Sequence, residues 1–140
     1  MPAKISIAIF RGDATQWSDC HAAIYVCYSN DEIHLLHLTN THPFFDFTEE
    51  SFAEAIIRPD LKALISVGIA SMAIPETLIR VVCALVPIRN DFLHVNWSSQ
   101  DWVCEALDKF VAVGILTDKE RSKAIGFMRD YCRECRDGPG

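Results

Sequence analysis

Apolar residues in the first forty positions follow the pattern of short strands. Three apolar runs, at residues 5–10, 21–28 and 32–38, are separated by turn-forming or aperiodic segments, which predicts three strands. The cluster Ser29-Asn30-Asp31 predicts a turn, because such side chains cap their own backbone. Residues 11–19 have no periodicity and predict a loop. We therefore expect the second and third strands to form a hairpin.

The middle of the chain carries weaker patterns. Residues 39–47 predict a loop that contains three phenylalanines, and residues 51–58 fit a short helix. The apolar run at residues 64–73 fits either a strand or a buried helix, and we predict a strand. Pro75 suits the first position of a helix and Glu76 suits the positive end of its dipole, which predicts a helix to about residue 86.

Helical spacing dominates the C-terminal third. Residues 91–95 predict a short extended segment, and Ser98-Ser99-Gln100-Asp101 then supplies a hydroxyl cap and an acid in the first turn of a helix. That helix is expected to end near Gly114. Thr117 and Glu120 form a capping box that starts a last helix. The inward positions of this last helix are Ala124, Ile125, Met128 and Tyr131.

Taken together, these patterns predict one domain of the α+β class, in which a small antiparallel sheet packs against helices. A chain of 140 residues has the commonest size of a single domain. We therefore expect one domain over residues 1–140, with a fraying tail at about residues 136–140.

Charge and cysteine content narrow the partners. The chain has 13 Lys and Arg against 19 Asp and Glu, a net charge of −6. A nucleic-acid partner requires a basic surface, so we expect none. The apolar N-terminal run is too short for a signal peptide or a membrane span, so we expect a cytoplasmic protein with no membrane partner. The apolar content needs no covalent staple, and Cys132 and Cys135 lack a second ligand pair nearby. We expect six reduced cysteines and no metal.

Three residues form the candidate chemistry: His21 at the start of a strand, His37 on the next strand, and Ser99 at the start of a helix. A nucleophile in the first turn of a helix gains from the dipole and from free main-chain N–H groups that can hold an oxyanion. A histidine on a neighbouring strand can act as its base, and a third polar residue can fix the imidazole tautomer. His34 and His37 face opposite sides of a strand, and we choose His37.

The segments His21-Ala-Ala-Ile-Tyr-Val, Leu35-Leu36-His37-Leu38 and Ser98-Ser99-Gln100-Asp101-Trp102-Val103 resemble the circularly permuted branch of the papain-like NlpC-type superfamily. Lecithin:retinol acyltransferase-like proteins have a His-hydrophobic strand, a second His strand and an Asn-Cys-Glu-His-Phe-Val helix start. The chain is also similar to small uncharacterised fungal proteins with His-Trp-x-Leu strands and a Gly-Cys-Arg-Tyr-Trp-Val helix start. The resemblance covers roughly residues 21–116 and implies a permuted papain-like fold.

The resemblance also implies roles for the three residues. His21 matches the base, His37 matches the orienting group, and Ser99 stands where the family has its nucleophilic cysteine. A hydroxyl is a far weaker nucleophile than a thiol. Three explanations fit Ser99: a Cys→Ser change made to trap a complex, a natural serine variant, or a homologue that has lost catalysis.

The expected function is therefore a hydrolase, or an acyl or amide transferase, of the papain-like thiol class with a covalent intermediate on residue 99 and no cofactor. Gln100 and Asp101 are candidate pocket residues, and Trp97 and Phe45 suit a small apolar or aromatic substrate. One alternative is a non-catalytic domain that binds a ligand or a protein. Another is a cleft enzyme that rearranges or cyclises a metabolite by acid–base chemistry with His21 and Asp101.

Ordinary structural roles are the competing interpretations of several residues. Helix capping by itself explains Ser98 and Ser99, and Trp102 fits a core aromatic. Cys104 lies more than a turn beyond Ser99 and is not expected to replace it. We interpret the acidic run Asp46, Glu49, Glu50 and Glu54 as a solvated surface.

Overall fold

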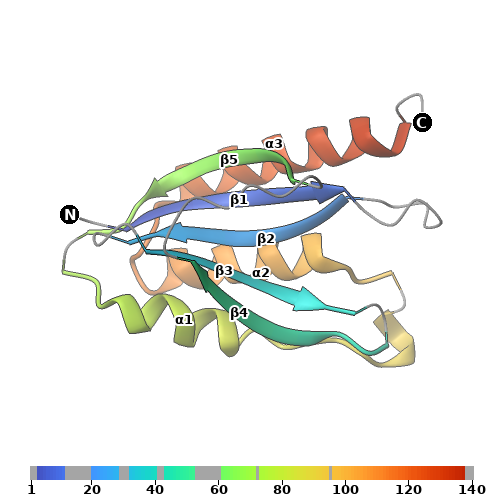
Figure 1. The fold of residues 1–140 in the computed structure, drawn as a ribbon, viewed down its shortest axis with the longest axis horizontal. Helices are drawn as coiled ribbons and strands as arrows, with labels where there is room; N and C mark the ends of the chain where they lie inside the picture. Colours follow the sequence, from blue (N-terminus) through green and yellow to red (C-terminus); the bar gives the residue numbers. More distant parts are fainter. Residues whose placement is uncertain are drawn as a thin grey trace.

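The computed structural model describes residues 3–11, 20–28, 32–40, 43–52, 61–71, 73–94 and 96–137, with side chains for all of these except 52 and 134–137. Along the chain, the described strands come first and the helices follow (Figure 1). Their bounds are β1 Lys4–Arg11, β2 Cys20–Cys27, β3 Ile33–Thr39, β4 Asp46–Phe52, β5 Leu61–Ile69, α1 Glu76–Ala84, the 3-10 helix η1 Phe92–His94, α2 Ser99–Ala112 and α3 Asp118–Asp137.

The described strands form one five-stranded antiparallel sheet in the order β4-β3-β2-β1-β5. β1 and β2 pair along their whole length, from Lys4↔Cys27 to Arg11↔Cys20. β2 and β3 pair over a shorter stretch, from Ile24↔Leu36 to Cys27↔Ile33. The molecule is thus an α+β protein with an antiparallel sheet, as the sequence predicted.

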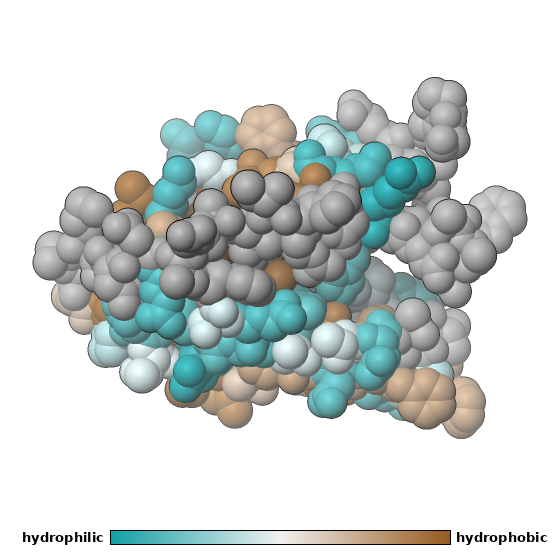
Figure 2. Space-filling model, viewed as in Figure 1, coloured by the Kyte–Doolittle hydropathy of each residue, from teal (hydrophilic) through white to brown (hydrophobic). Residues whose placement is uncertain are grey.

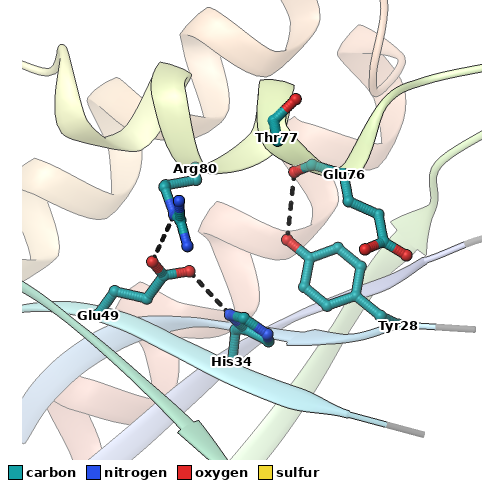
Figure 3. Close-up of a pocket in the computed structure, with 6 residues that line it drawn as sticks. All are labelled: Tyr28, His34, Glu49, Glu76, Thr77 and Arg80. Carbon is teal, nitrogen blue, oxygen red and sulfur yellow. Dashed lines mark hydrogen bonds and ion pairs between the residues drawn. The ribbon is translucent and has the colours of Figure 1, made fainter. Parts of the chain in front are cut away.

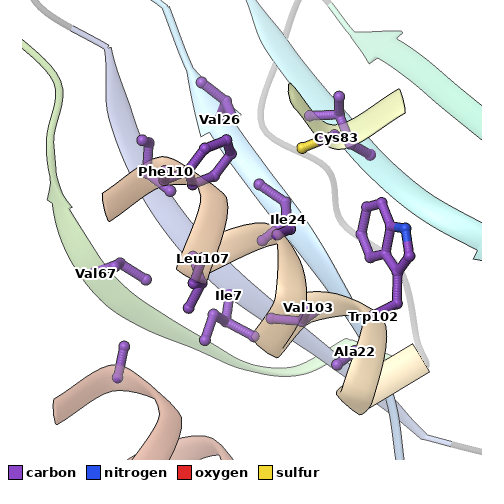
Figure 4. Packing of buried hydrophobic residues seen from close by; sticks show 14 of the residues in the cluster. Ile7, Ala22, Ile24, Val26, Val67, Cys83, Trp102, Val103, Leu107 and Phe110 are labelled. Carbon is purple, nitrogen blue, oxygen red and sulfur yellow. The ribbon is translucent and has the colours of Figure 1, made fainter. Parts of the chain in front are cut away.

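One face of the sheet carries the main core. Because side chains alternate along a strand, Ala22, Ile24 and Val26 of β2 all point toward the helices. A stripe of apolar residues at helical spacing on α2 packs against them. Figure 4 shows this stripe lying over β1 and β2. The fully buried members on α2 are Trp102, Val103, Ala106, Leu107 and Phe110. Helices α1 and α3 extend the same core.

The other face holds a smaller buried cluster of Ala8, Phe10, Ala23 and Leu35. The same alternation places the side chains of His21 and His37 on this second face, next to that cluster. The sheet therefore separates the helix-side core from the two candidate histidines.

Two segments differ from the sequence prediction. Residues 46–50, predicted as part loop and part unassigned, belong to β4, as does Ser51, predicted to start a helix. Pairing with β3, from Ile33↔Phe52 to Thr39↔Asp46, stabilises a strand whose acidic composition does not favour one locally. Residues 91–95 were predicted to be extended, but residues 92–94 form η1, and Asp91 accepts a hydrogen bond from the main-chain N–H of Leu93. Residue 95 lies outside the described residues. Residues 12–19, 29–31 and 53–58 lie outside the described residues.

Hydrophobic side chains gather at the lower margin of Figure 2, where α1 and η1 run in Figure 1, whereas hydrophilic side chains dominate the other described parts of this view. Phe92 and Leu93 of η1 are each 90% exposed, and Leu85 just after α1 is 69% exposed. In the part of the chain that the structure describes, no helix has both the length and the apolar character to cross a membrane.

Gly114 and Gly126 provide a matched pair for testing backbone conformation. A Cβ added at either position meets no atom within 4 Å, but Gly114 follows the C-cap of α2 with φ of +83° while Gly126 lies inside α3. We expect Gly126→Ala to stabilise the protein by about 0.5–1 kcal/mol. Gly114→Ala should instead cost about 1 kcal/mol, because an L side chain disfavours the left-handed region. Urea unfolding of both variants measures this, and shifts of the same sign would contradict it.

Candidate functional site

The N-terminus of α2 is attached to the start of β2 by its first two side chains. The Oγ atom of Ser99 accepts a hydrogen bond of 3.1 Å from the main-chain N–H of Ala22, and Nε2 of Gln100 donates one of 3.2 Å to the carbonyl oxygen of Cys20. Both contacts lie just beyond Ile24, where the pairing of β2 with β3 ends. The helix start therefore docks on the two residues that flank His21.

His21 is partly buried and lies between these two contacts along β2. Its ring centroid is 5.9 Å from that of His37, with the rings nearly perpendicular at 84°, and 6.3 Å from that of Phe10. The peptide N–H bound by Ser99 is the one that joins His21 to Ala22. The structure thus brings the three predicted residues to the same end of the sheet, in the order Ser99, His21, His37.

Ser99 reaches this site from the helix side, while the side chain of His21 leaves β2 toward the other face. Ser99 is only 6% exposed. Its oxygen already accepts the Ala22 N–H, so the hydroxyl also serves to hold α2 on the sheet. The described contacts of Ser99 are therefore structural, and they lie on the face of the sheet opposite the His21 side chain.

Removal of the Ser99 hydroxyl should weaken this attachment. Ser99→Ala leaves the buried N–H of Ala22 without its side-chain acceptor, and we expect a loss of about 1–3 kcal/mol in the free energy of unfolding. Ser122→Ala is the matched control, because Ser122 is an exposed helical serine and its substitution should change stability by less than about 0.5 kcal/mol. Equal losses in the two variants, measured by urea unfolding, would argue against the role of the Ser99–Ala22 contact.

Glu50 is a member of the site that the sequence interpretation missed. Its Oε2 atom lies 3.1 Å from Nε2 of His37, whose side chain is 12% exposed. Glu50 pairs across the strands with Leu35, which makes it the diagonal neighbour of His37. The acidic run is therefore not simply solvated, since Glu49 also binds a histidine, His34, at 2.8 Å. No local pattern shows these pairs, because they depend on the register between β3 and β4.

The polar pocket candidates both serve the start of α2. The Oδ2 atom of Asp101 accepts a hydrogen bond of 2.9 Å from the main-chain N–H of Ser98, which is the acidic half of a capping box. Gln100 uses its amide on Cys20. These contacts support capping and docking roles, and the alternative in which Asp101 acts with His21 gains no support from them.

The aromatic pocket candidates pack against the helix-side core. Trp97 is 9% exposed, its indole N–H donates to Glu105 Oε2 at 2.8 Å, and its ring lies 5.7 Å from that of Phe45. Asn90 binds both the N–H and the C=O of Phe45, at 2.9 and 3.0 Å. The two rings are therefore held in fixed positions between β4 and α2 rather than projecting into solvent.

A separate small pocket of about 90 Å³ opens between α1 and the sheet. Figure 3 shows its lining: Tyr28, His34, Glu49, Glu76, Thr77 and Arg80. Both ring nitrogens of His34 contact carboxylates, Nδ1 with Glu49 at 2.8 Å and Nε2 with Glu32 at 3.0 Å. Arg80 binds the other oxygen of Glu49 at 2.6 Å. The side chains of His34, Glu49 and Arg80 in this pocket thus contact one another.

Tyr28 closes one side of the same pocket. Its hydroxyl donates to the carbonyl oxygen of Glu76 at 3.4 Å. Burial raises the pKa of Tyr28 above its usual value, and the nearby charges of Glu49 and Glu76 raise it further. The phenol therefore remains neutral and acts as a hydrogen-bond donor that ties β2 to α1.

Two of the described cysteines, Cys83 and Cys104, lie in surroundings that disfavour the thiolate form. Cys27, Cys83 and Cys104 are free thiols, and the side chain of Cys135 lies outside the described residues. Burial raises the pKa of Cys83 and of Cys104, and for Cys104 it outweighs the opposing effect of Arg129. Both thiols are therefore poor nucleophiles. Within the described residues, no group of three or more His, Cys, Asp or Glu side chains could hold a metal ion.

The chain was compared with protein families, curated proteins and solved structures. No protein-family model, curated protein or solved structure gives a significant match to the chain. What is shown is therefore the class, an α+β protein with an antiparallel sheet and helices against one of its faces.

Proposed function

We propose that this chain has a permuted papain-like fold and carries an acyl-transfer site of the Cys/Ser-His-His type, in a hydrolase or an acyl or amide transferase. The observation that supports it best is the hydrogen bond from the His21–Ala22 peptide to Ser99 Oγ. This bond holds the start of α2 beside the residue that follows His21, and the His21 ring contacts that of His37. The proposed substrate is small and apolar or aromatic, but Phe45 and Trp97 pack in the helix-side core and do not support this part of the proposal.

In this proposal, the side chain of residue 99 attacks the carbonyl carbon of the substrate. The His21 side chain, which leaves β2 on the face opposite Ser99, must turn toward residue 99 in this scheme. It then takes the proton of the nucleophile and delivers it to the leaving group, so that an ester or thioester joins the acyl group to residue 99. Water or an acceptor alcohol or amine then releases the acyl group. His37 orients His21. The main-chain N–H groups at the start of α2 stabilise the oxyanion that forms in each step.

The second candidate is a domain of the same fold that binds a ligand or protein without catalysis. The burial of Ser99 and its use as an acceptor for Ala22 favour this candidate, because a hydroxyl engaged in helix docking is a poor nucleophile. The direction of the His21 side chain, toward the face opposite Ser99, favours it as well, because a base must reach the nucleophile whose proton it takes. A thiol placed at position 99 separates the two. An acyl adduct on that residue supports the catalytic proposal, and its absence supports binding.

A further inference from the structure

The edge strand β4 supplies one carboxylate to each histidine of β3. Glu49 binds His34 on the helix side of the sheet, and Glu50 binds His37 on the other side. The His34 pair is part of a larger network, because His34 also contacts Glu32 and Glu49 also binds Arg80. The His37 pair instead leads toward His21, whose ring contacts His37. In both pairs the histidine and the glutamate are diagonal neighbours across β3 and β4, but the residues around the two pairs differ.

The contact with Glu50 determines the tautomer of His37. An ionised carboxylate can only accept hydrogen bonds, so the Nε2 atom that contacts it at 3.1 Å must carry a hydrogen. In neutral His37, the Nδ1 atom is then the acceptor. The side chain of His37 is only 12% exposed, so water has limited access to compete for these atoms.

We infer that Glu50 is a positioning residue of the candidate site, which holds the ring and the Nε2–H tautomer of His37 so that His37 in turn orients His21. The inference rests on the proposed function for its catalytic consequence, whereas the tautomer can be measured without any activity. Carboxylates that orient histidines in this way are known to matter where the histidine binds a metal, and their loss typically costs about 10–100-fold.

Nitrogen NMR of the labelled protein tests the tautomer. We expect His37 to carry its hydrogen on Nε2 in the unchanged protein, and Glu50→Ala to convert it to a mixture of both tautomers. Asp46→Ala is the matched control, because Asp46 is an exposed carboxylate on the same strand and should leave the His37 signals unchanged. A His37 that carries its hydrogen on Nδ1, or that does not respond to Glu50→Ala, overturns the inference.

The catalytic consequence is tested in the Ser99→Cys background with a simple activated ester. Adding Glu50→Ala should lower kcat/KM roughly 10-fold and shift the pH profile, whereas Glu50→Gln should restore part of the rate and Asp46→Ala should change neither. An unchanged rate and pH profile in Glu50→Ala overturns the positioning role by itself. If Ser99→Cys forms no adduct at all, the proposed function fails, and the catalytic role of Glu50 fails with it even where the tautomer is as expected.

Discussion

Ser99→Cys is expected to give the protein a reactive thiol that is acylated by simple activated esters. Residue 99 is the first residue of α2, and its side chain contacts the main-chain N–H of Ala22, the residue that follows His21. A thiol at a helix N-terminus near an imidazole can have a pKa low enough to be largely thiolate near neutrality, whereas a serine hydroxyl cannot. Intact-protein mass spectrometry detects the adduct, and release of the leaving group gives the rate.

The histidine variants show whether this reactivity belongs to an organised site. His21→Ala in the Ser99→Cys background should remove most of the rate, roughly 10²–10⁴-fold, which is the usual contribution of a positioned general base. His37→Ala should cost less, because an orienting group acts only through the imidazole it holds. Ser122→Cys places a thiol on the exposed side of α3 and is the control for ordinary cysteine reactivity. The proposal is wrong if the two introduced thiols react equally or if His21→Ala has no effect.

Phe110→Ala is expected to cost about 3–5 kcal/mol in the free energy of unfolding. Phe110 is fully buried in the core between α2 and the strands, which Figure 4 shows. Its truncation leaves a cavity there. The loss is comparable to much of the stability of a typical domain. Urea unfolding followed by circular dichroism measures it, provided that the variant is still folded in the absence of urea.

Phe92→Ala is the matched control for this core substitution. The same atoms are removed, but Phe92 is 90% exposed in η1, so the expected change is less than about 0.5 kcal/mol. If Phe110→Ala were as mild as Phe92→Ala, the docking of α2 on the sheet described here would be incorrect. A Phe110→Ala variant that is unfolded without urea agrees with the expectation, because the loss then exceeds the total stability.

Segments with strong local signals could be predicted from the sequence. The apolar runs of β1, β2 and β3 are bounded by aperiodic or turn-forming residues, and the structure confirms them as strands. The starts of α2 and α3 were marked by capping residues, and Glu120 accepts from the main-chain N–H of Thr117 at 2.9 Å as the capping box predicts. Such signals arise from neighbours in the chain, so the sequence contains them in full.

β4 and η1 could not be predicted in this way. The composition of β4 is acidic, and it becomes a strand because its main chain pairs with β3. η1 depends on a hydrogen bond from Leu93 to the side chain of Asp91, which competes with the extended conformation. In both places, a specific contact outweighs the average preference of the residues.

The candidate site also combines features that local sequence patterns predict with features that depend on long-range contacts. The sequence by itself determined the identities of His21, His37 and Ser99, their order along the chain, and the helix start that carries Ser99, since these are local patterns. Only the tertiary structure decided that Ser99 binds the N–H of Ala22, 77 positions away, and that Glu50 binds His37. Both contacts depend on how a helix docks on the sheet and on the register between two strands. These are set by packing and pairing over the whole core, and no short stretch of residues encodes them.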